Sequence, residues 1–238
     1  MNYIPVNVKQ GSVQWFAARC GIPTASNFDS IVTPKTYKPT ANEARRTYRA
    51  KLLYEIFTGL AADNYVDPAM ERGTLLEPKA REWYSFATNR EVKQVGFCYK
   101  QGFAGKFGAS PDGLCEDRGL EIKCIYPANH IRLLLADEAD AAAPYYSQCQ
   151  AGIWVCGADL WDLVLYCPED NIPRRIITIH RDDKLCAAFD EYIPAFCQEL
   201  AECKARMITM GGEVVKTAEI PDWAMLPGDE PAQEGATA

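Results

Sequence analysis

A short turn followed by a charged strand limits the folds open to this chain more than any other segment. The turn is Ser110-Pro111-Asp112-Gly113, and the apolar run at residues 120–125 carries only two charges, Glu121 and Lys123. Side chains alternate between the two faces of a strand, so this acid and this lysine share one face while Ile122 points to the other. The pattern predicts a strand with one face in the core and the other beside the acid of the turn.

Two carboxylates and a lysine in this arrangement are typical of metal-dependent phosphodiester cleavage. That reaction needs charge neutralised on the phosphate and a hydroxide at neutral pH, and Mg²⁺, which prefers oxygen ligands, supplies both. We expect Asp112 and Glu121 to bind the cation and Lys123 to orient the attacking water. The backbone C=O of Ile122 is a further ligand if that strand edge is unpaired. Acid-x-lysine triplets occur five times in the chain, so the strand context and the preceding turn single out this one.

Apolar periodicity and capping signals predict one mixed α/β domain. Pro78 predicts a kink or a new helix start, Pro194 marks a kink or break, and residues 135–143 are expected to form a loop. We assign residues 1–212 to a single domain and residues 213–238 to an acidic, partly disordered tail. Helices are expected over residues 11–20, 24–32, 43–58, 68–87, 145–156 and 182–210, and strands over residues 92–99, 120–125, 160–166 and 175–180.

Charge and cysteine content narrow the class of protein. The net charge is −7, yet residues 1–60 hold eight basic and three acidic side chains, which suits either a phosphate backbone or a solvated face. Ten cysteines without a C-x-x-C pair and only two histidines argue against zinc and favour reduced, buried thiols. No apolar run is long enough to span a membrane, and the N-terminus lacks a signal-peptide pattern, so we expect a cytoplasmic protein.

Six ordered motifs together resemble the phage lambda-type alkaline exonucleases, also called the YqaJ-like viral recombinases. They extend from about residue 11 to residue 207 and cover most of the chain. The motifs are Trp15-Phe16-Ala17-Ala18-Arg19 with Thr24-Ala25-Ser26; Gly73 with Glu77 and Ala80-Arg81; Ser110-Pro111-Asp112-Gly113-Leu114; Leu120-Glu121-Ile122-Lys123-Cys124; Tyr146 with Gln148 and Gln150; and Arg181-Asp182-Asp183-Lys184 with Phe189-Asp190-Glu191.

The resemblance implies an α/β (α+β) fold with a PD-(D/E)xK, restriction-endonuclease-like core, in which a central mixed sheet is flanked by helices. It implies Mg²⁺-dependent 5′-to-3′ degradation of linear double-stranded DNA to 5′-mononucleotides, which leaves a 3′ single strand for recombination. Two Mg²⁺ ions are expected, with Mn²⁺ as an alternative. A homotrimer, a single-strand annealing protein as partner and a phage or prophage origin in a bacterial host are also implied.

The resemblance also assigns roles to individual residues. Arg19, Ser26 and Ser110 resemble the residues that hold the 5′-phosphate of the substrate end, and a planar guanidinium suits a phosphate. The catalytic and metal-binding residues implied are Asp112, Glu121, Lys123, Glu77 and Gln148, with Ile122 giving its backbone carbonyl and Glu77 as an additional acid.

Other readings of these residues stay open at this point. Arg45, Arg46 and Arg49 cluster on one side of a helix start and are assigned to duplex contacts, although charge runs usually face solvent. Arg19 could equally end its helix, and Glu77 could be only a helix cap. A PD-(D/E)xK endonuclease and a DNA-end-binding recombination module without cleavage are the alternative functions.

Overall fold

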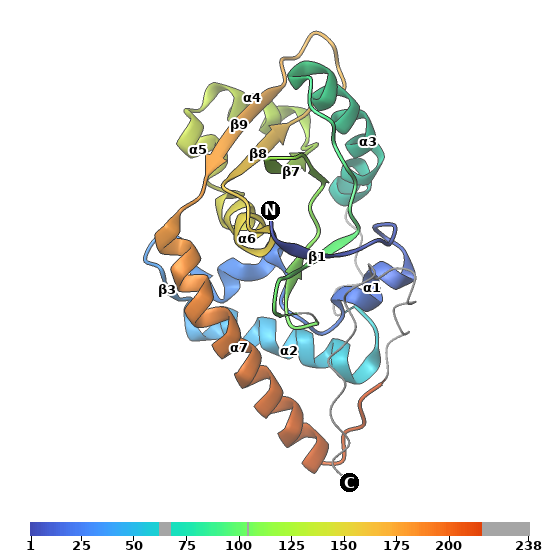
Figure 1. Ribbon diagram of the computed structural model, residues 1–238, viewed down its shortest axis with the longest axis vertical. Coiled ribbons are helices and arrows are strands. Elements are labelled where there is room, and N and C mark those ends of the chain that lie inside the picture. The colour runs from blue at the N-terminus through green and yellow to red at the C-terminus, as the bar shows by residue number, and fades with distance from the viewer. Residues whose placement is uncertain (62–67, 104, 216–238) are drawn as a thin grey trace.

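The computed structural model describes residues 1–61, 68–103 and 105–215. Its largest sheet has four strands and lies in the upper half of the molecule as drawn in Figure 1. The strand order is β6-β7-β8-β9, with β7 and β8 parallel and the outer pairs antiparallel. The mixed sheet that the sequence predicts is therefore confirmed. Its strands are β6 (Gly113–Leu114), β7 (Arg118–Lys123), β8 (Leu160–Leu165) and β9 (Arg175–His180).

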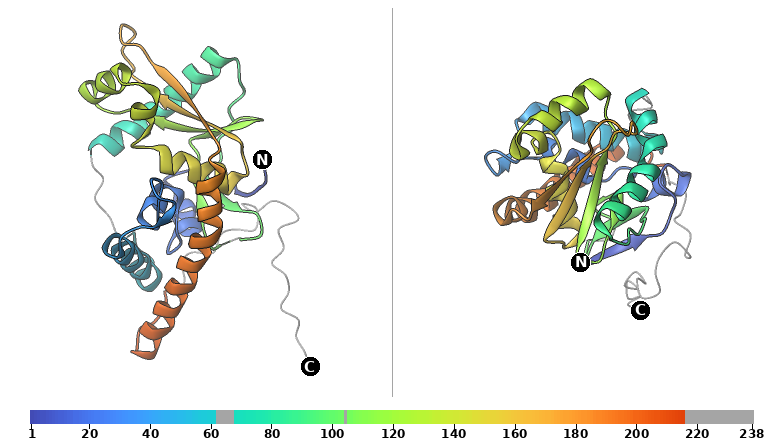
Figure 2. Two further views of the ribbon diagram at one scale, coloured as in Figure 1. Left: turned by 90° about the vertical axis from the view of Figure 1, so that its left-hand side faces the viewer. Right: turned by 90° about the horizontal axis from the view of Figure 1, so that it is seen from above.

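Helices cover both faces of this sheet. The helix α3 (Pro68–Thr88) packs through Ala80 and Tyr84 against Leu120 and Ile122 of β7. The other face meets α6 (Tyr146–Cys156), which contacts both β7 and β8. Seen from above in Figure 2, the teal helix α3 lies along one side of the strands. Because α3 buries Ile122, Glu121 and Lys123 must face the side of α6.

A second, three-stranded antiparallel sheet lies on the far side of α6. It consists of β1 (Tyr3–Val6), β4 (Phe97–Lys100) and β5 (Gly108–Ala109) in the order β1-β4-β5. The helix α6 contacts β4 and β5 as well as the main sheet, so it lies between the two sheets. The turn at residues 110–112 joins β5 to β6. It therefore crosses from one sheet to the other and brings Asp112 to the gap between them.

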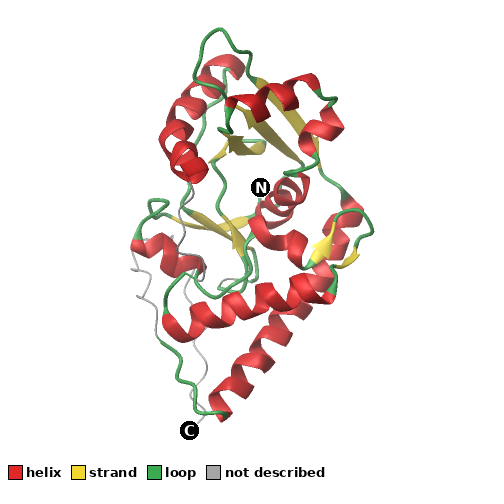
Figure 3. Cartoon of the chain, turned by 180° about the vertical axis from the view of Figure 1, so that it is seen from behind, coloured by secondary structure: helices red, strands yellow, loops and turns green. Residues whose placement is uncertain are grey.

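The remaining elements surround this frame (Figure 3). The long helices α2 and α7 pack against each other, and Gly59 ends α2 in the left-handed conformation that glycine adopts without strain. The short η1 lies against α6, and α1 against β4. Their bounds are α1 (Val13–Arg19), η1 (Ala25–Ser30), β2 (Val32–Thr33), β3 (Lys38–Pro39), α2 (Asn42–Thr58), α4 (Pro127–Leu135), α5 (Glu138–Ala142) and α7 (Asp183–Thr209).

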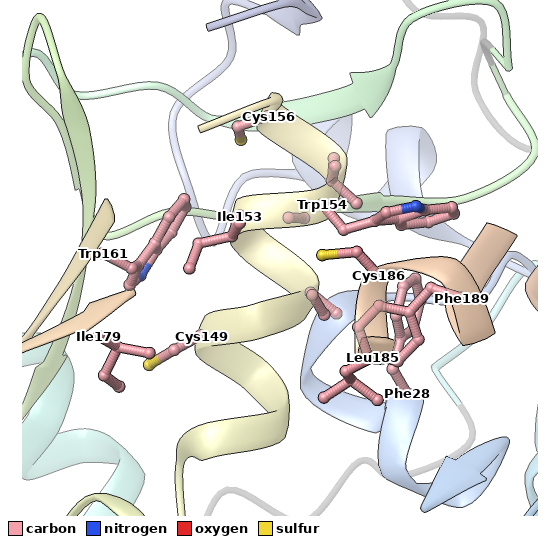
Figure 4. Packing of buried hydrophobic residues seen from close by; sticks show 14 of the residues in the cluster. Phe28, Cys149, Ile153, Trp154, Cys156, Trp161, Ile179, Leu185, Cys186 and Phe189 are labelled. Carbon is pink, nitrogen blue, oxygen red and sulfur yellow. The ribbon is translucent and has the colours of Figure 1, made fainter. Parts of the chain in front are cut away.

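The core is built around α6, whose residues from Cys149 to Cys156 are all buried. Trp154 packs with its ring centroid 5.8 Å from Phe28 of η1 and 5.7 Å from Phe189 of α7 (Figure 4). On the sheet side, a Cβ at Gly152 would overlap the ring of Trp161. The close approach of α6 to the sheet thus requires glycine at that position, and it sets how near α6 residues lie to β7.

Several expected boundaries are wrong. The strand expected at residues 92–99 is confined to β4, because Lys93 makes only an isolated bridge to Leu114. Residues 135–143 contain α5, which Asp137 caps by accepting a hydrogen bond from the Asp140 amide. A new helix start at Pro78 and a break at Pro194 are also wrong, because both prolines lie inside helices, α3 and α7; a kink at either proline stays a prediction. The segment at residues 24–32 is the 3-10 helix η1, and β1 and α4 were not foreseen.

The other expected elements are confirmed with small shifts at their ends. The structure has helices where they were expected, at residues 11–20, 43–58, 145–156 and 182–210. It has strands where they were expected, at residues 120–125, 160–166 and 175–180. Residues 216–238 of the expected acidic tail lie outside the described residues, so the domain assignment stays a prediction. Within the described residues, no helix is both long and apolar enough to cross a membrane.

Candidate active site

The strand β7 delivers its acid and its lysine to one point, as side-chain alternation predicts. Lys123 Nζ lies 2.7 Å from Glu121 Oε1 and donates to Gln148 Oε1 of α6 at 3.4 Å. The same ammonium group lies 5.0 Å from the ring centroid of Tyr145. Ile122, between the two charged residues, is buried in the cluster under α3. The lysine is thus held over the strand by one carboxylate, one amide and one ring.

Asp112 reaches the same point from the turn between the two sheets. Its backbone N–H donates to Leu120 O at 3.1 Å, and its Oδ2 accepts a hydrogen bond from the Ile122 amide at 2.6 Å. Pairing of β6 with β7 ends at Leu120. The N–H and C=O of one strand residue point to the same side, so the Ile122 carbonyl faces the unpaired edge beside Asp112. The condition for a backbone ligand at this residue is met.

Glu77 approaches from α3 and is paired with Arg81 one helical turn later. The guanidinium Nη1 of Arg81 is shared between Glu77 Oε1 and the backbone carbonyl of Asp112, to which it donates at 3.1 Å. The α3 acid is therefore tied to the turn that carries Asp112. Sequence reasoning matched Arg81 within a motif but gave it no role.

One cavity of about 190 Å³ joins the predicted phosphate-holding residues to this cluster. Its wall comes from α1, η1, β5, the 110–112 turn, β7, α6 and β8, so elements far apart in the sequence converge on it. The structure brings together six of the residues predicted for the site, because the lining includes Arg19, Ser26, Ser110, Asp112, Glu121 and Gln148.

Trp15 is a lining residue that sequence reasoning matched within a motif but gave no role. Its indole Nε1 donates to Ser110 Oγ and to Gly96 O, each at 3.0 Å. The Arg19 guanidinium lies over its ring, with Cζ 4.3 Å from the ring centroid. Stacking leaves the edges of the guanidinium free to donate hydrogen bonds. The i, i+4 spacing of Trp15 and Arg19 on one short helix was the available signal.

Burial and crowding of carboxylates dominate the electrostatics. Burial, followed by the charges of Glu121 and Glu77, raises the pKa of Asp112 well above its usual value. Burial also raises the pKa of Glu121, although Lys123 opposes the shift. Burial alone would lower the pKa of Lys123, but Glu121 outweighs it and the pKa rises. Lys123 therefore stays protonated, and ionisation of the two acids is disfavoured until a positive charge, such as a cation, joins them.

The three arginines predicted to touch duplex DNA do not line this cavity. Arg45 Nη2 and Arg49 Nη1 bind the two carboxylate oxygens of Glu199 on α7, at 2.7 and 2.8 Å. Arg46 is exposed on the same helix. Their predicted contact with DNA stays a prediction, and two of them already help to hold α2 against α7.

Two further motif residues have structural contacts. Gln150 accepts from the Asp182 amide at 2.9 Å and donates to His180 O at 2.7 Å, while the Tyr146 hydroxyl donates to Asp182 Oδ2 at 3.1 Å. Asp182 also caps α7 by accepting from the amides of Lys184 and Leu185. These contacts join α6 to the junction between β9 and α7, and so they fix the helix that carries Gln148.

The donor set fits a hard divalent cation. Asp112 and Glu121 offer carboxylate oxygens, Ile122 offers a carbonyl oxygen, and Glu77 stands near both acids. No group of three acidic, cysteine or histidine side chains among the described residues converges closely enough to hold a metal alone. A site here would therefore need the backbone oxygen, and Glu77, whose Oε1 pairs with Arg81, would be an additional acid.

Comparisons with known proteins agree with this geometry. Residues 14–159 match the YqaJ-like viral recombinase domain family. The alkaline exonuclease LHK-Exo from Laribacter hongkongensis is 33% identical, with a TM-score of 0.71 over 84% of this chain and 98% of that chain. A second structure of LHK-Exo, in complex with dAMP, matches equally well. A phage-related exonuclease from Haemophilus somnus 129PT, at 16% identity and a TM-score of 0.57, covers 84% of this chain and 96% of its own.

A shorter match is to the putative uncharacterized protein ExoD of Escherichia coli (strain K12). It is 31% identical over 70 residues, which are 29% of this chain and 80% of ExoD. The fold and the acid–lysine cluster define a DNA-degrading nuclease of the exonuclease class. The chain belongs to the YqaJ-like viral recombinase family.

Proposed function

We propose that this exonuclease is Mg²⁺-dependent and degrades linear double-stranded DNA in the 5′-to-3′ direction. It would release 5′-mononucleotides and leave a 3′ single strand for recombination. The observation that carries the proposal is the single cavity that joins Arg19, Ser26 and Ser110 to Asp112 and Glu121. An anion-binding wall beside a cation-binding wall fits a terminal phosphate next to the bond to be cut.

The cation would be held by Asp112, Glu121 and the Ile122 carbonyl, with Glu77 as an additional acid. Bound Mg²⁺ supplies charge neutralisation on the phosphate and a hydroxide at neutral pH, and a pair of ions, of Mg²⁺ or of Mn²⁺, can serve the attacking and leaving oxygens. Lys123, kept protonated by Glu121, orients the attacking water and offsets the charge that develops on the phosphate. Gln148 accepts from Lys123 and so keeps its ammonium directed into the site.

The other end of the cavity would select the substrate end. Arg19 offers a planar fork to a phosphate, and Ser110, oriented by the Trp15 indole, offers a hydroxyl. A 5′-phosphate held there can be reached only from a chain end, which favours exonuclease over endonuclease action. The LHK-Exo structure with dAMP contains a deoxynucleoside monophosphate, the kind of product proposed here.

Assembly is a further part of the proposal. A homotrimer that encircles DNA would make digestion processive, and a single-strand annealing protein would receive the exposed strand. The family name, viral recombinase, supports a role in recombination in a phage-infected or lysogenic bacterial cell. Arg45, Arg46 and Arg49 are proposed to contact the duplex as it approaches, although Glu199 competes for two of them.

A digest of one linear duplex tests the proposal. The duplex is labelled separately at its 5′ and 3′ ends and incubated with Mg²⁺ beside a closed circle of the same sequence. We expect early release of the 5′ label as a mononucleotide and an intact circle. A cut circle would favour the alternative of a PD-(D/E)xK endonuclease. Binding of ends without cleavage in Mg²⁺ or Mn²⁺ would favour an end-binding recombination module.

A further inference from the structure

Arg81 connects two acidic parts of the site through one guanidinium. Its side chain is only 14% exposed, and Nη1 contacts both the Glu77 carboxylate and the Asp112 carbonyl. Neither contact belongs to the hydrophobic packing of α3 against β7, which involves Ala80 and Tyr84. The position of Arg81 is therefore best explained by the charges around it.

The guanidinium of Arg81 balances part of the negative charge of the site. Three acids meet there, and their mutual repulsion contributes to the raised pKa of Asp112. Lys123 pairs with Glu121, and Arg81 pairs with Glu77. Without Arg81, the three carboxylates would share one half-buried lysine, Lys123, an arrangement that carries a large energetic cost. Arg81 thus provides the positive charge that Glu77 requires when no cation is bound.

We propose that Arg81 is a positioning residue that occupies Glu77 in the metal-free protein and yields this carboxylate to the cation. The inference rests on the proposed metal site. In the metal-free protein, Glu77 is held beside Asp112 but engaged by Arg81. Cation binding would exchange one positive partner of Glu77 for another, so Arg81 and the cation compete for the same carboxylate.

The anchoring of α3 allows this exchange without movement of the helix. Tyr84, three residues after Arg81, donates from its hydroxyl to the buried Asp162 of β8 at 2.6 Å. Asp162 is itself fixed by Arg118 and Thr178. Because this anchor lies on the other side of Arg81 from Glu77, a substitution at Arg81 frees the carboxylate and leaves the docking of α3 in place.

Titration of Mn²⁺ alone into the protein by calorimetry, without DNA, tests the inference. Arg81→Gln removes the competing charge, so we expect its Mn²⁺ affinity to rise about 5-fold or more. Arg81→Lys keeps a charge and should stay within about 2-fold of the wild type. In a Glu77→Gln background, Arg81→Gln should change the affinity by less than about 2-fold, because the carboxylate it released is gone.

Controls separate competition from a purely structural role. Tyr84→Phe removes the anchor of α3 without altering the charges, and we expect wild-type Mn²⁺ affinity at a lower resistance to urea. Equal or weaker Mn²⁺ binding by Arg81→Gln, or an equal change with and without Glu77, overturns the inference. Should Arg81→Gln fail to fold, Glu77→Gln decides alone: about 10-fold weaker binding supports Glu77 as a ligand, and unchanged binding overturns it.

The same titration distinguishes this inference from the proposed metal site. If the wild-type protein binds Mn²⁺ and Asp112→Asn does not, the metal site stands, whatever Arg81→Gln does. If the wild-type protein binds no Mn²⁺ at all, the metal site itself fails.

Discussion

Two buried carboxylates on adjacent strands of one sheet have opposite surroundings. Asp162 on β8 is 2% exposed and Glu121 on β7 is 4% exposed. Asp162 receives hydrogen bonds from Tyr84 at 2.6 Å, Thr178 at 2.7 Å and Arg118 at 3.1 Å. Glu121 pairs with Lys123 and faces Glu77 and Asp112. The first carboxylate is saturated with donors, while the second lies in a cluster with surplus negative charge.

In this fold, the partners of a buried acid distinguish a structural role from a functional one. A buried carboxylate with every oxygen satisfied holds elements together, here α3, β7, β8 and β9. A buried carboxylate crowded by others stores unfavourable energy that a bound cation can relieve. Burial alone does not distinguish the two residues, but their partners do.

The largest expected effect is the loss of cleavage in Asp112→Asn. The substitution removes a cation ligand at the centre of the crowded cluster, so we expect the rate to fall by about 10⁴-fold or more. The free energy of unfolding without metal should change little. The variant weakens the acceptor for the Ile122 amide, but it also removes the repulsion between Asp112 and the other two acids. Single-turnover cleavage of a linear duplex measures the first quantity, and end binding in EDTA provides the control. Wild-type cleavage by this variant would remove Asp112 from the site.

The next largest expected effect is a loss of stability when Asp162, the carboxylate saturated with hydrogen-bond donors, is replaced. Asp162→Asn removes the buried charge that pairs with Arg118 and leaves this arginine with the exposed Asp117, so we expect the free energy of unfolding to fall by about 3 kcal/mol. Asp117→Asn is a matched control, because Asp117 pairs with the same arginine but is exposed; its loss should be below about 1 kcal/mol. Urea unfolding measures both. Equal losses for the two variants would contradict the distinction between the sites.

Arg19→Ala should affect the choice of DNA end. A charge-assisted contact to phosphate is worth about 2 kcal/mol, so we expect about 30-fold weaker use of 5′-phosphorylated ends. Use of 5′-hydroxyl ends should change far less. Competition between the two kinds of duplex end measures the ratio. Equal losses on both ends would remove the phosphate-holding role from Arg19.

The smallest expected effect is a pH dependence that only the crowded cluster shows. Folding raises the pKa of Asp112 and Glu121, so the native state binds more protons than the unfolded chain above about pH 4. In EDTA, these two groups stabilise the protein at low pH, and the contribution is lost as pH rises through the raised pKa values. Each pKa unit corresponds to about 1.4 kcal/mol. Urea unfolding of the wild type and of Asp112→Asn over this pH range measures the contribution of Asp112. If the difference in unfolding free energy between the two proteins does not change with pH, the pKa of Asp112 is not raised and the carboxylates do not repel one another as described.

The strand part of the site could be predicted because one local rule governs it. Side-chain alternation alone placed Glu121 and Lys123 together and Ile122 in the core, as the structure has them. The gathering of Arg19, Ser26 and Ser110 in one cavity with Asp112 depends on contacts between distant elements. That arrangement followed from a family resemblance, since no periodicity within the chain contains it.

Other features depended on tertiary structure that the local pattern does not encode. Pro78 left a kink or a new helix open, and α3, which packs on the sheet, continues past this proline without a break. Residues 92–96 have strand-like composition, but the backbone of Lys93 finds a partner only at Leu114. Arg45 and Arg49 had the composition of a DNA-binding patch, yet their geometry includes Glu199, which is about 150 residues away in sequence.

Diffraction from crystals soaked in Mn²⁺, with data collected at the anomalous edge of manganese, tests the proposed metal site without relying on activity. We predict an anomalous peak bounded by the Asp112 and Glu121 carboxylates and the Ile122 carbonyl oxygen. We predict none at Asp162, whose oxygens are already occupied. A peak at Asp162, or binding of Mn²⁺ away from both carboxylates of the crowded cluster, would contradict this prediction.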